Sequence, residues 1–308
     1  MFLASRTKTI HFVRHAEGTH NAANHAHGDD TPTLHSTPGA WTYEDARLTD
    51  AGIAQCLGLR ASLAVAVSPQ LVVVSPFSRA LQTAHLLFAN GGAPTAASTH
   101  SATQPASDSA APSNIFDNIN SSNSNNNYSV ASLNNAPPFI VHHLCAERSG
   151  RYTCDKRRNK NDIITDFQPI FDATLDRIDF DSFGFPDDAD IVWSPERESS
   201  ESVSNRAIKM MEWLATRPES DIAVVTHSSW LKHLFAGFGG NVATKDKLNM
   251  HRLTGNAEVR SVCLAMHRGF YPEGEWKGDT FIPSHKSFHR FRYAPTPEAL
   301  ANMHKSVQ

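Results

Sequence analysis

Residues 8–21 read KTIHFVRHAEGTHN, and this stretch joins a strand-like run to an arginine and a histidine. Its first half, Lys8 to Val13, is rich in β-branched and aromatic residues and alternates weakly in polarity, which predicts a β-strand. Arg14 and His15 follow at the carboxyl end of that strand. A guanidinium matches the oxygens of a phosphate, and a neutral imidazole can attack phosphorus, so the strand end is a candidate site for phosphate chemistry.

Two later segments repeat this arrangement of an apolar strand followed by a basic side chain. Leu71 to Val74 is a short apolar run that ends at Ser75 and Pro76, and Arg79 follows in a predicted helix over 78–90. The strand predicted over 221–226 is followed by His227 and a predicted helix over 228–238. Strands that alternate with helices predict a three-layer α/β sandwich with a mainly parallel central sheet. Ligands of such sheets bind beyond the carboxyl ends of the strands.

The remaining residues supply further elements around these three segments. We predict helices over 48–67 and 201–215, the first with Thr49 or Asp50 as its N-cap, and strands over 139–141 and 257–266. A polar loop is expected from Asn21 to about Arg47. Residues 91–138 are dominated by Ser, Asn, Ala, Thr and Pro, so we expect a disordered insertion within a single domain that spans 1–308.

The motifs, taken in order, resemble the histidine phosphatase superfamily, which includes the cofactor-dependent phosphoglycerate mutases. Arg14-His15-Ala16 resembles the Arg-His-Gly signature of that family, although alanine replaces its glycine. The other three matches are Leu48-Thr49-x-x-Gly52-x-x-Gln55, Ser75-Pro76-x-x-Arg79-x-x-Gln82-Thr83 and Thr226-His227. A single motif of this kind is weak evidence, whereas four in the family's order over residues 8–238 are strong evidence.

The resemblance implies a role for each matching residue. His15 would be the nucleophile, with one ring nitrogen facing phosphorus and the other donating to a carbonyl, and Asn21 would add a neutral donor. Arg14, Arg79 and His227 would neutralise the phosphoryl oxygens as charge builds up during transfer. Glu147, which follows the third strand as the family's acid does, would protonate the leaving oxygen. Glu17 and Asp155 are weaker candidates for that acid.

A basic run lies a few residues beyond Glu147. Residues 152–158 read YTCDKRR and resemble a Cys-Asp-x-Arg version found in eukaryotic phosphoglycerate-mutase-like phosphatases, as does Glu201-Ser202 followed by Arg206. Lys156, Arg157 or Arg158 would then hold a second anionic group of the substrate. The alternative for this run is a solvated charged face.

Composition limits the classes of protein to which the chain can belong. A formal charge of −3 argues against a nucleic-acid partner and an anionic membrane surface, because both normally require a basic excess. The four cysteines form no C-x-x-C pair and no long apolar segment occurs, which favours reduced thiols in a cytoplasmic protein. Seventeen histidines raise the possibility of a metal site, yet their spacing supports none, and histidine-phosphate chemistry requires no metal or other cofactor.

Three functions fit these motifs. The main hypothesis is a phosphatase that hydrolyses a small phosphorylated metabolite through a phosphohistidine on His15. A mutase that returns the phosphoryl group to another hydroxyl, and a catalytically inactive module that binds a phosphorylated ligand, are the alternatives. Substrate specificity is expected in the loops at 24–47 and 150–195. Residues 239–308 and the oligomeric state are left without an interpretation.

Overall fold

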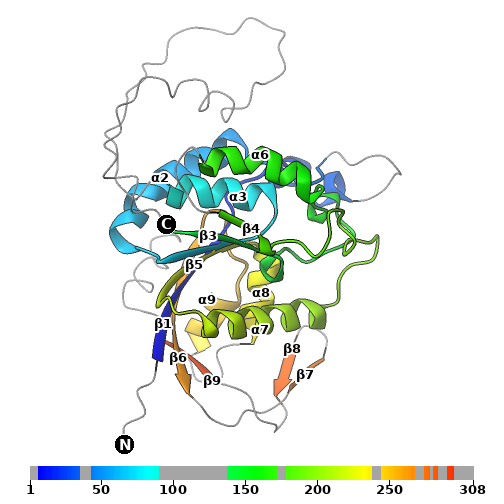
Figure 1. Ribbon diagram of the computed structural model, residues 1–308. Coiled ribbons are helices and arrows are strands. Elements are labelled where there is room, and N and C mark those ends of the chain that lie inside the picture. The colour runs from blue at the N-terminus through cyan, green and yellow to red at the C-terminus, as the bar shows by residue number, and fades with distance from the viewer. Residues whose placement is uncertain are drawn as a thin grey trace, which may run out of the picture.

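A seven-stranded sheet forms the middle layer of the computed structural model, with the strands in the order β4-β3-β2-β5-β1-β6-β9 (Figure 1). The structure describes residues 6–34, 43–89, 137–172, 178–237, 244–267, 274–277, 280–283 and 290–294. Five neighbouring strands run parallel. At one side β6 pairs with β1 in the antiparallel direction, and β9 in turn pairs antiparallel with β6. The strands are β1 (Arg6–Arg14), β2 (Leu71–Val74), β3 (Phe139–His142), β4 (Ile178–Phe183), β5 (Asp221–Thr226), β6 (Val259–His267) and β9 (Arg290–Ala294). A separate hairpin pairs β7 (Gly274–Lys277) with β8 (Thr280–Pro283).

Helices cover both faces of the sheet, as Figure 1 shows, which confirms the predicted three-layer α/β sandwich. One face carries α2 (Asp50–Ala66), α3 (Ser78–Ala84), its π-helical continuation (His85–Ala89) and α6 (Lys160–Asp172). The other carries α7 (Ser200–Thr216), α8 (Ser228–Ala236) and α9 (Thr244–His251). Within the described residues, no helix combines the length and apolar character that crossing a bilayer requires.

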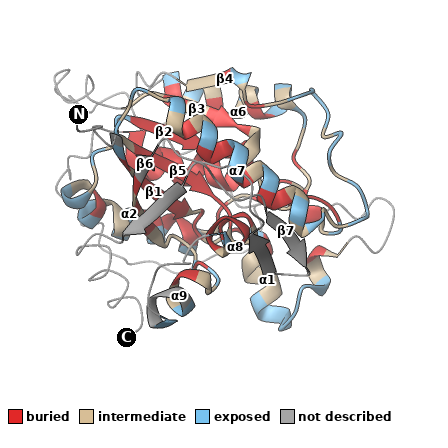
Figure 2. Cartoon of the chain, turned by 90° about the horizontal axis from the view of Figure 1, so that it is seen from below, coloured by how far each residue is buried: buried red, intermediate tan, exposed pale blue. Residues whose placement is uncertain are grey.

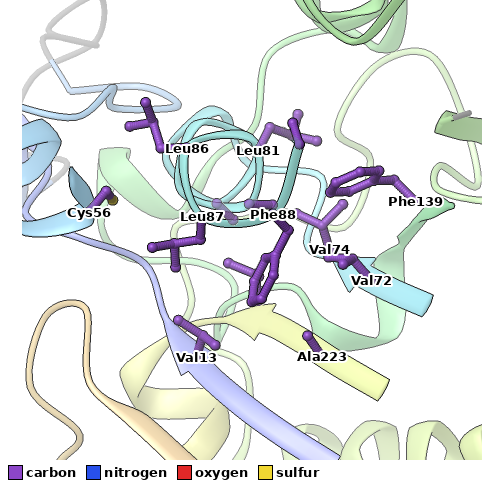
Figure 3. Packing of buried hydrophobic residues seen from close by; sticks show 14 of the residues in the cluster. Val13, Cys56, Val72, Val74, Leu81, Leu86, Leu87, Phe88, Phe139 and Ala223 are labelled. Carbon is purple, nitrogen blue, oxygen red and sulfur yellow. The ribbon is translucent and has the colours of Figure 1, made fainter. Parts of the chain in front are cut away.

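The strands divide their side chains between two hydrophobic cores because successive residues of a strand point to opposite faces. On β2, Val72 and Val74 join the core beneath α3, where Figure 3 shows them beside Leu81 and Phe139. Leu71 and Val73 belong to the core on the α7 and α8 side. Buried residues therefore concentrate in the central strands and the inner faces of the helices (Figure 2). A continuous apolar run such as β2 is expected for a strand covered on both faces.

The boundaries predicted for several elements agree with the structure, and others are wrong. Thr49 is the N-cap of α2, since its side-chain oxygen accepts a hydrogen bond from the backbone N–H of Gly52 at 3.0 Å. The segment expected to be a polar loop begins with a helix, α1 (Thr19–His27), and includes a 3₁₀ turn (Thr31–Thr33). Helix α1 lacks an apolar stripe, and its single buried residue is His20. The pattern of polar residues therefore could not reveal it.

Most of the insertion predicted over 91–138 lies outside the described residues, and β3 begins directly after it, at Phe139. The single domain over 1–308 remains a prediction.

Candidate active site

The order of the strands brings the three basic motifs together at one edge of the sheet. Strand β5 lies between β1 and β2, and all three run parallel. In this register Arg14 is paired with Thr226, and Val74 is paired with Val225. The residues that follow the strands, among them His15, Ser75 and His227, therefore leave the sheet at the same level. Their convergence follows from the strand order, because these residues are far apart in sequence.

His15 is buried and its ring is fixed at both nitrogens. Nδ1 lies 2.7 Å from the backbone oxygen of Ala16, and Nε2 lies 3.3 Å from Nε of Arg79. An arginine can only donate, so Nε2 of His15 is the acceptor and Nδ1 carries the proton that it donates to Ala16. Burial, followed by the charge of Arg79, holds the pKa of His15 well below its usual range. The ring is therefore neutral at physiological pH, with the lone pair of Nε2 directed at a guanidinium.

Arg79 lies almost wholly inside the molecule, and backbone and side-chain oxygens orient it. Nη1 donates to the backbone oxygen of Cys154 at 2.8 Å, and Nη2 lies 3.5 Å from Oδ1 of Asp155. The guanidinium also stacks over the ring of Phe77, with 4.6 Å between Cζ and the ring centroid. These contacts leave Nε pointing at His15. Among the described residues the one ion pair of Arg79, with Asp155, is long, so this buried guanidinium supplies local positive charge beside His15 although the protein as a whole is negatively charged.

His227 and Arg14 complete a cluster with His15 and Arg79. The rings of His227 and His15 lie 5.1 Å apart between centroids, and Nε2 of His227 lies 2.7 Å from Oγ of Ser75. Burial, assisted by Arg79, holds the pKa of His227 well below its usual range. Arg14 donates from Nη1 to the backbone oxygen of Thr254 at 2.7 Å.

Two polar atoms of this cluster are buried and have no hydrogen-bond partner among the described residues. They are Nδ1 of His227 and Nε of Arg14. Buried polar atoms without partners are uncommon in proteins and indicate a ligand site when they cluster. Both belong to groups that bind an anion, because the guanidinium can only donate and the imidazole can donate one proton.

Glu147 lies in the loop that follows β3, and its carboxyl group contacts the first turn of α8, the helix that begins directly after His227. Its Oε1 accepts hydrogen bonds from the backbone N–H groups of Arg148 at 2.8 Å and Trp230 at 3.0 Å. Its Oε2 accepts one long bond, 3.3 Å, from the backbone of Ser229. Each carboxylate oxygen has two lone-pair positions, so Oε2 retains one that can carry a proton. The structure thus places this predicted acid beside the cluster and leaves one of its oxygens available.

The two weaker candidates for the acid have different surroundings. Oε1 of Glu17 accepts a hydrogen bond from the hydroxyl of Thr49 at 2.7 Å, which ties it to the start of α2. Asp155 is buried between Arg79 and Arg197, and its Oδ2 lies 2.6 Å from Nη1 of Arg197. Burial raises the pKa of Asp155 to about 6; Arg197 opposes that change, and the negative charge of Glu147 adds to it.

The loop before β6 also contributes to the site, and no motif in the sequence predicts it. Nδ2 of Asn256 donates to the backbone oxygen of His15 and to Oδ1 of Asn21, both at 3.2 Å. Asn21 also accepts from the backbone N–H of Gly18 at 3.1 Å, so its side-chain oxygen is occupied. The amide hydrogens of Asn21 remain the group with which it could bind a substrate oxygen. Thr254, which anchors Arg14, acts through its backbone, so residue type gives no signal there.

The basic run 156–158 is largely committed to contacts within the protein. Nζ of Lys156 lies 2.8 Å from Oε1 of Glu44. Arg157 is buried, and its Nη1 and Nη2 donate to four backbone oxygens, those of Arg158, Asp187, Asp188 and Ala189. Arg158 forms ion pairs with Asp45 and Asp166. These contacts support neighbouring loops, and binding of a second anionic group by the run remains a prediction.

A metal ion has no evident place among these side chains. In the part of the chain that the structure describes, no three His, Cys, Asp or Glu residues are grouped so that they could hold one.

The fold and the cluster together define an α/β protein that gathers arginines and neutral histidines at the carboxyl edge of a parallel sheet. Residues 10–99 match the model of the histidine phosphatase superfamily, branch 1. Over 265 residues the chain is 35% identical to a phosphoglycerate mutase-like protein of Arabidopsis thaliana, an alignment that covers 84% of this chain and 85% of that protein. The chain belongs to the histidine phosphatase superfamily.

Other relatives and solved structures match over similar lengths. Phosphoglycerate mutase-like protein 1 of Arabidopsis thaliana is 30% identical over 263 residues, covering 84% of this chain and 82% of that protein. Among solved structures, the phosphoglycerate mutase of Bacillus anthracis is 13% identical with a TM-score of 0.44, covering 99% of this chain and 98% of that one. A putative alpha-ribazole-5'-P phosphatase of Escherichia coli is 15% identical with a TM-score of 0.43, covering 91% and 97%.

Proposed function

We propose that the protein is a phosphatase that hydrolyses a small phosphorylated metabolite through a phosphohistidine on His15. The observation that supports this most directly is the state of His15: a neutral ring whose Nδ1 proton is donated to Ala16 and whose Nε2 lone pair meets Arg79. A neutral imidazole with a fixed tautomer is a competent nucleophile.

In the first step, Nε2 of His15 attacks phosphorus and the bond from phosphorus to the ester oxygen breaks. Guanidinium groups of Arg14 and Arg79 and a ring nitrogen of His227 donate to the non-bridging oxygens while charge redistributes. These donors are already in place before the reaction, so their electrostatic stabilisation requires little reorganisation. The hydrogen bond from Arg79 to His15 is given up as the lone pair turns to phosphorus.

The leaving oxygen takes its proton from Glu147, for which Oε2 is the available atom. In the second step, water attacks the phosphohistidine, Glu147 accepts a proton from that water, and the electron pair of the N–P bond returns to Nε2. Inorganic phosphate leaves, and both His15 and Glu147 regain their starting states. No metal or redox cofactor takes part in this cycle.

The test is to trap the phosphoenzyme and to measure turnover of a panel of phosphorylated metabolites. Wild-type protein should form an acid-labile, base-stable phosphoprotein, and His15→Ala should form none, whereas His25→Ala, which alters an exposed histidine of α1, should behave as wild type. Glu147→Gln should lower kcat about 10²-fold or more, because general acid catalysis is lost. Full activity in His15→Ala would refute the nucleophile.

The same panel separates hydrolysis from mutase chemistry. A phosphatase releases inorganic phosphate in proportion to the ester consumed, while a mutase yields an isomeric ester with the total ester conserved. Accumulation of the isomer would replace the proposed activity with the alternative one. If the protein binds the esters but never turns them over, it is an inactive binding module.

A further inference from the structure

One buried side chain beside the cluster has no role in the steps described above. His20, on the first turn of α1, is 6% exposed, and its ring centroid lies 5.6 Å from that of His15. Its Nδ1 is buried and has no hydrogen-bond partner among the described residues. Burying an imidazole nitrogen without a hydrogen bond costs free energy, and no other residue of α1 is buried. The position of His20 is therefore best explained by a ligand that supplies the missing partner when it binds.

Gly18 provides the space that His20 occupies. A Cβ atom on Gly18 would lie 2.8 Å from Nδ1 and 2.9 Å from Cε1 of His20, well inside normal contact distance. The backbone of Gly18 is extended, with φ of −98°, so a larger residue would be allowed conformationally. A glycine at position 18 therefore leaves room for the ring of His20. The backbone conformation at this position would by itself allow a larger residue.

Electrostatics and hydrogen bonding define the state of this ring. Burial, then the charges of Arg79 and Arg14, hold the pKa of His20 well below its usual range, so the ring is neutral. Nδ1 faces Gly18 with no acceptor among the described residues, and a buried N–H without an acceptor is unfavourable, so the proton of the neutral ring belongs on Nε2. Nε2 then offers a single donor in a region that contains the positive charges of Arg14 and Arg79.

We propose that His20 is a catalytic residue, whose Nε2–H donates to a non-bridging oxygen of the phosphoryl group during its transfer to and from His15. This inference rests on the proposed function and deepens it. His20 keeps its proton throughout, so the bonds formed and broken are those of the two transfer steps. His15 then works between two neutral imidazoles, His227 and His20, in addition to two arginines.

A set of substitutions at His20 tests this role. His20→Ala should lower kcat about 100-fold, as removal of a single transition-state donor commonly does. His20→Gln, which restores a neutral N–H donor, should recover kcat to within about tenfold of wild type. His25→Ala, on the same helix and exposed, should leave kcat unchanged. Melting temperatures of all variants show whether a loss of activity reflects unfolding.

Binding of inorganic phosphate tests the contact without relying on turnover. Calorimetric titration should give a Kd about tenfold weaker for His20→Ala than for wild type, and a Kd near wild type for His20→Gln. Unchanged kcat and Kd in folded His20→Ala would overturn the inference and leave the phosphohistidine mechanism intact. Conversely, absence of a phosphoenzyme in wild type would refute the proposed function, and the phosphate titration would still decide whether His20 binds the anion.

Gly18→Ala provides an independent test through the packing contact. In the wild-type background its Cβ should displace the ring and lower kcat toward that of His20→Ala. In the His20→Ala background the ring is absent and only the looser contact with the backbone oxygen of Arg47, at 3.3 Å, remains, so the same substitution should have a clearly smaller effect. Equal losses of kcat in both backgrounds would show that Gly18 acts through something other than His20, and would remove this support for the inference.

Discussion

Asp155 is the residue whose surroundings we expect to make the proposed activity sensitive to pH. Its buried carboxyl lies between Arg79, 3.5 Å away, and Arg197, 2.6 Å away, and its pKa is raised to about 6, chiefly by burial. Above pH 6 the ionised carboxylate pairs with both arginines. Below pH 6 it takes up a proton, the ion pairs weaken and Arg79 loses part of the framework that orients it toward His15.

We therefore predict an acid limb in kcat/KM with an apparent pKa near 6, along which activity falls as pH decreases. His15 does not produce this limb, because its own pKa lies well below the usual range and its ring stays neutral there. Asparagine cannot ionise, so in Asp155→Asn kcat/KM should fall less steeply around pH 6 than it does in wild type. At pH 8 the activity of Asp155→Asn should be lower than that of wild type. A substrate phosphate also titrates near pH 6, so the comparison requires the same substrate for both proteins. An identical limb in both would assign it to the substrate.

The motif Leu48-Thr49-x-x-Gly52-x-x-Gln55 holds in place the backbone that follows His15. The backbone N–H of Thr49 donates to the backbone oxygen of Glu17 at 3.0 Å, and Oε1 of Gln55 accepts from the backbone N–H of Glu17, also at 3.0 Å. A Cβ on Gly52 would lie 2.1 Å from the backbone oxygen of Glu17. The glycine thus permits the close approach of α2 to the segment that carries His15.

Gly52→Ala should accordingly destabilise the protein by about 1–3 kcal/mol, since a rigid backbone oxygen must move. A loss of stability would be informative, because replacing glycine with alanine in a helix normally stabilises it by about 1 kcal/mol. Gly58→Ala on the same helix is the matched control: it is exposed, nothing lies near its added Cβ, and it should stabilise by about 0.5–1 kcal/mol. Urea unfolding of the three proteins gives both values; stabilisation by both substitutions would contradict the packing argument.

The elements that the sequence predicts well are those with strong local patterns. The apolar runs at β2 and β5 and the capped start of α2 all appear where they were expected. Helix α6 went unpredicted although Ile163, Phe167 and Phe171 recur at helical spacing and are buried, because Pro169 and several Asp and Asn residues obscure the pattern. Edge strand β4 is polar and equally hard to recognise.

The candidate site likewise contains residues that the sequence can predict and residues that it cannot. Residues whose side chains match a family motif, such as His15 and Arg79, could be predicted, and the structure brings them together. Thr254 contributes a backbone oxygen, and His20 depends on the space above Gly18. Neither relation is encoded in residue type alone, so three-dimensional contacts were needed to identify both residues.

Across the whole molecule, several buried histidines are held neutral, and this couples folding to pH. The pKa of His85 is lowered to about 4 and that of His142 to about 3, in both cases chiefly by burial. In the unfolded chain these rings titrate near 6.5. The unfolded state therefore binds more protons below pH 6.5, and the folded state loses stability as pH falls from about 7 toward 4. The raised pKa of Asp155 acts in the opposite direction, between about pH 4 and 6.

His85 allows this coupling to be measured at one position, because its pKa is lowered chiefly by burial, with a smaller contribution from the charge of Arg60. Both of its ring nitrogens are buried without a hydrogen bond to any described residue, and its ring packs edge-on against Phe171 with 5.3 Å between centroids. Replacing it with leucine removes the titration. The difference in unfolding free energy between His85→Leu and wild type should increase by about 2 kcal/mol from pH 8 to pH 5, in favour of the variant. Subtracting the pH 8 value cancels any change in packing. A difference that stays constant with pH would mean that His85 is protonated to the same extent in the folded and unfolded states.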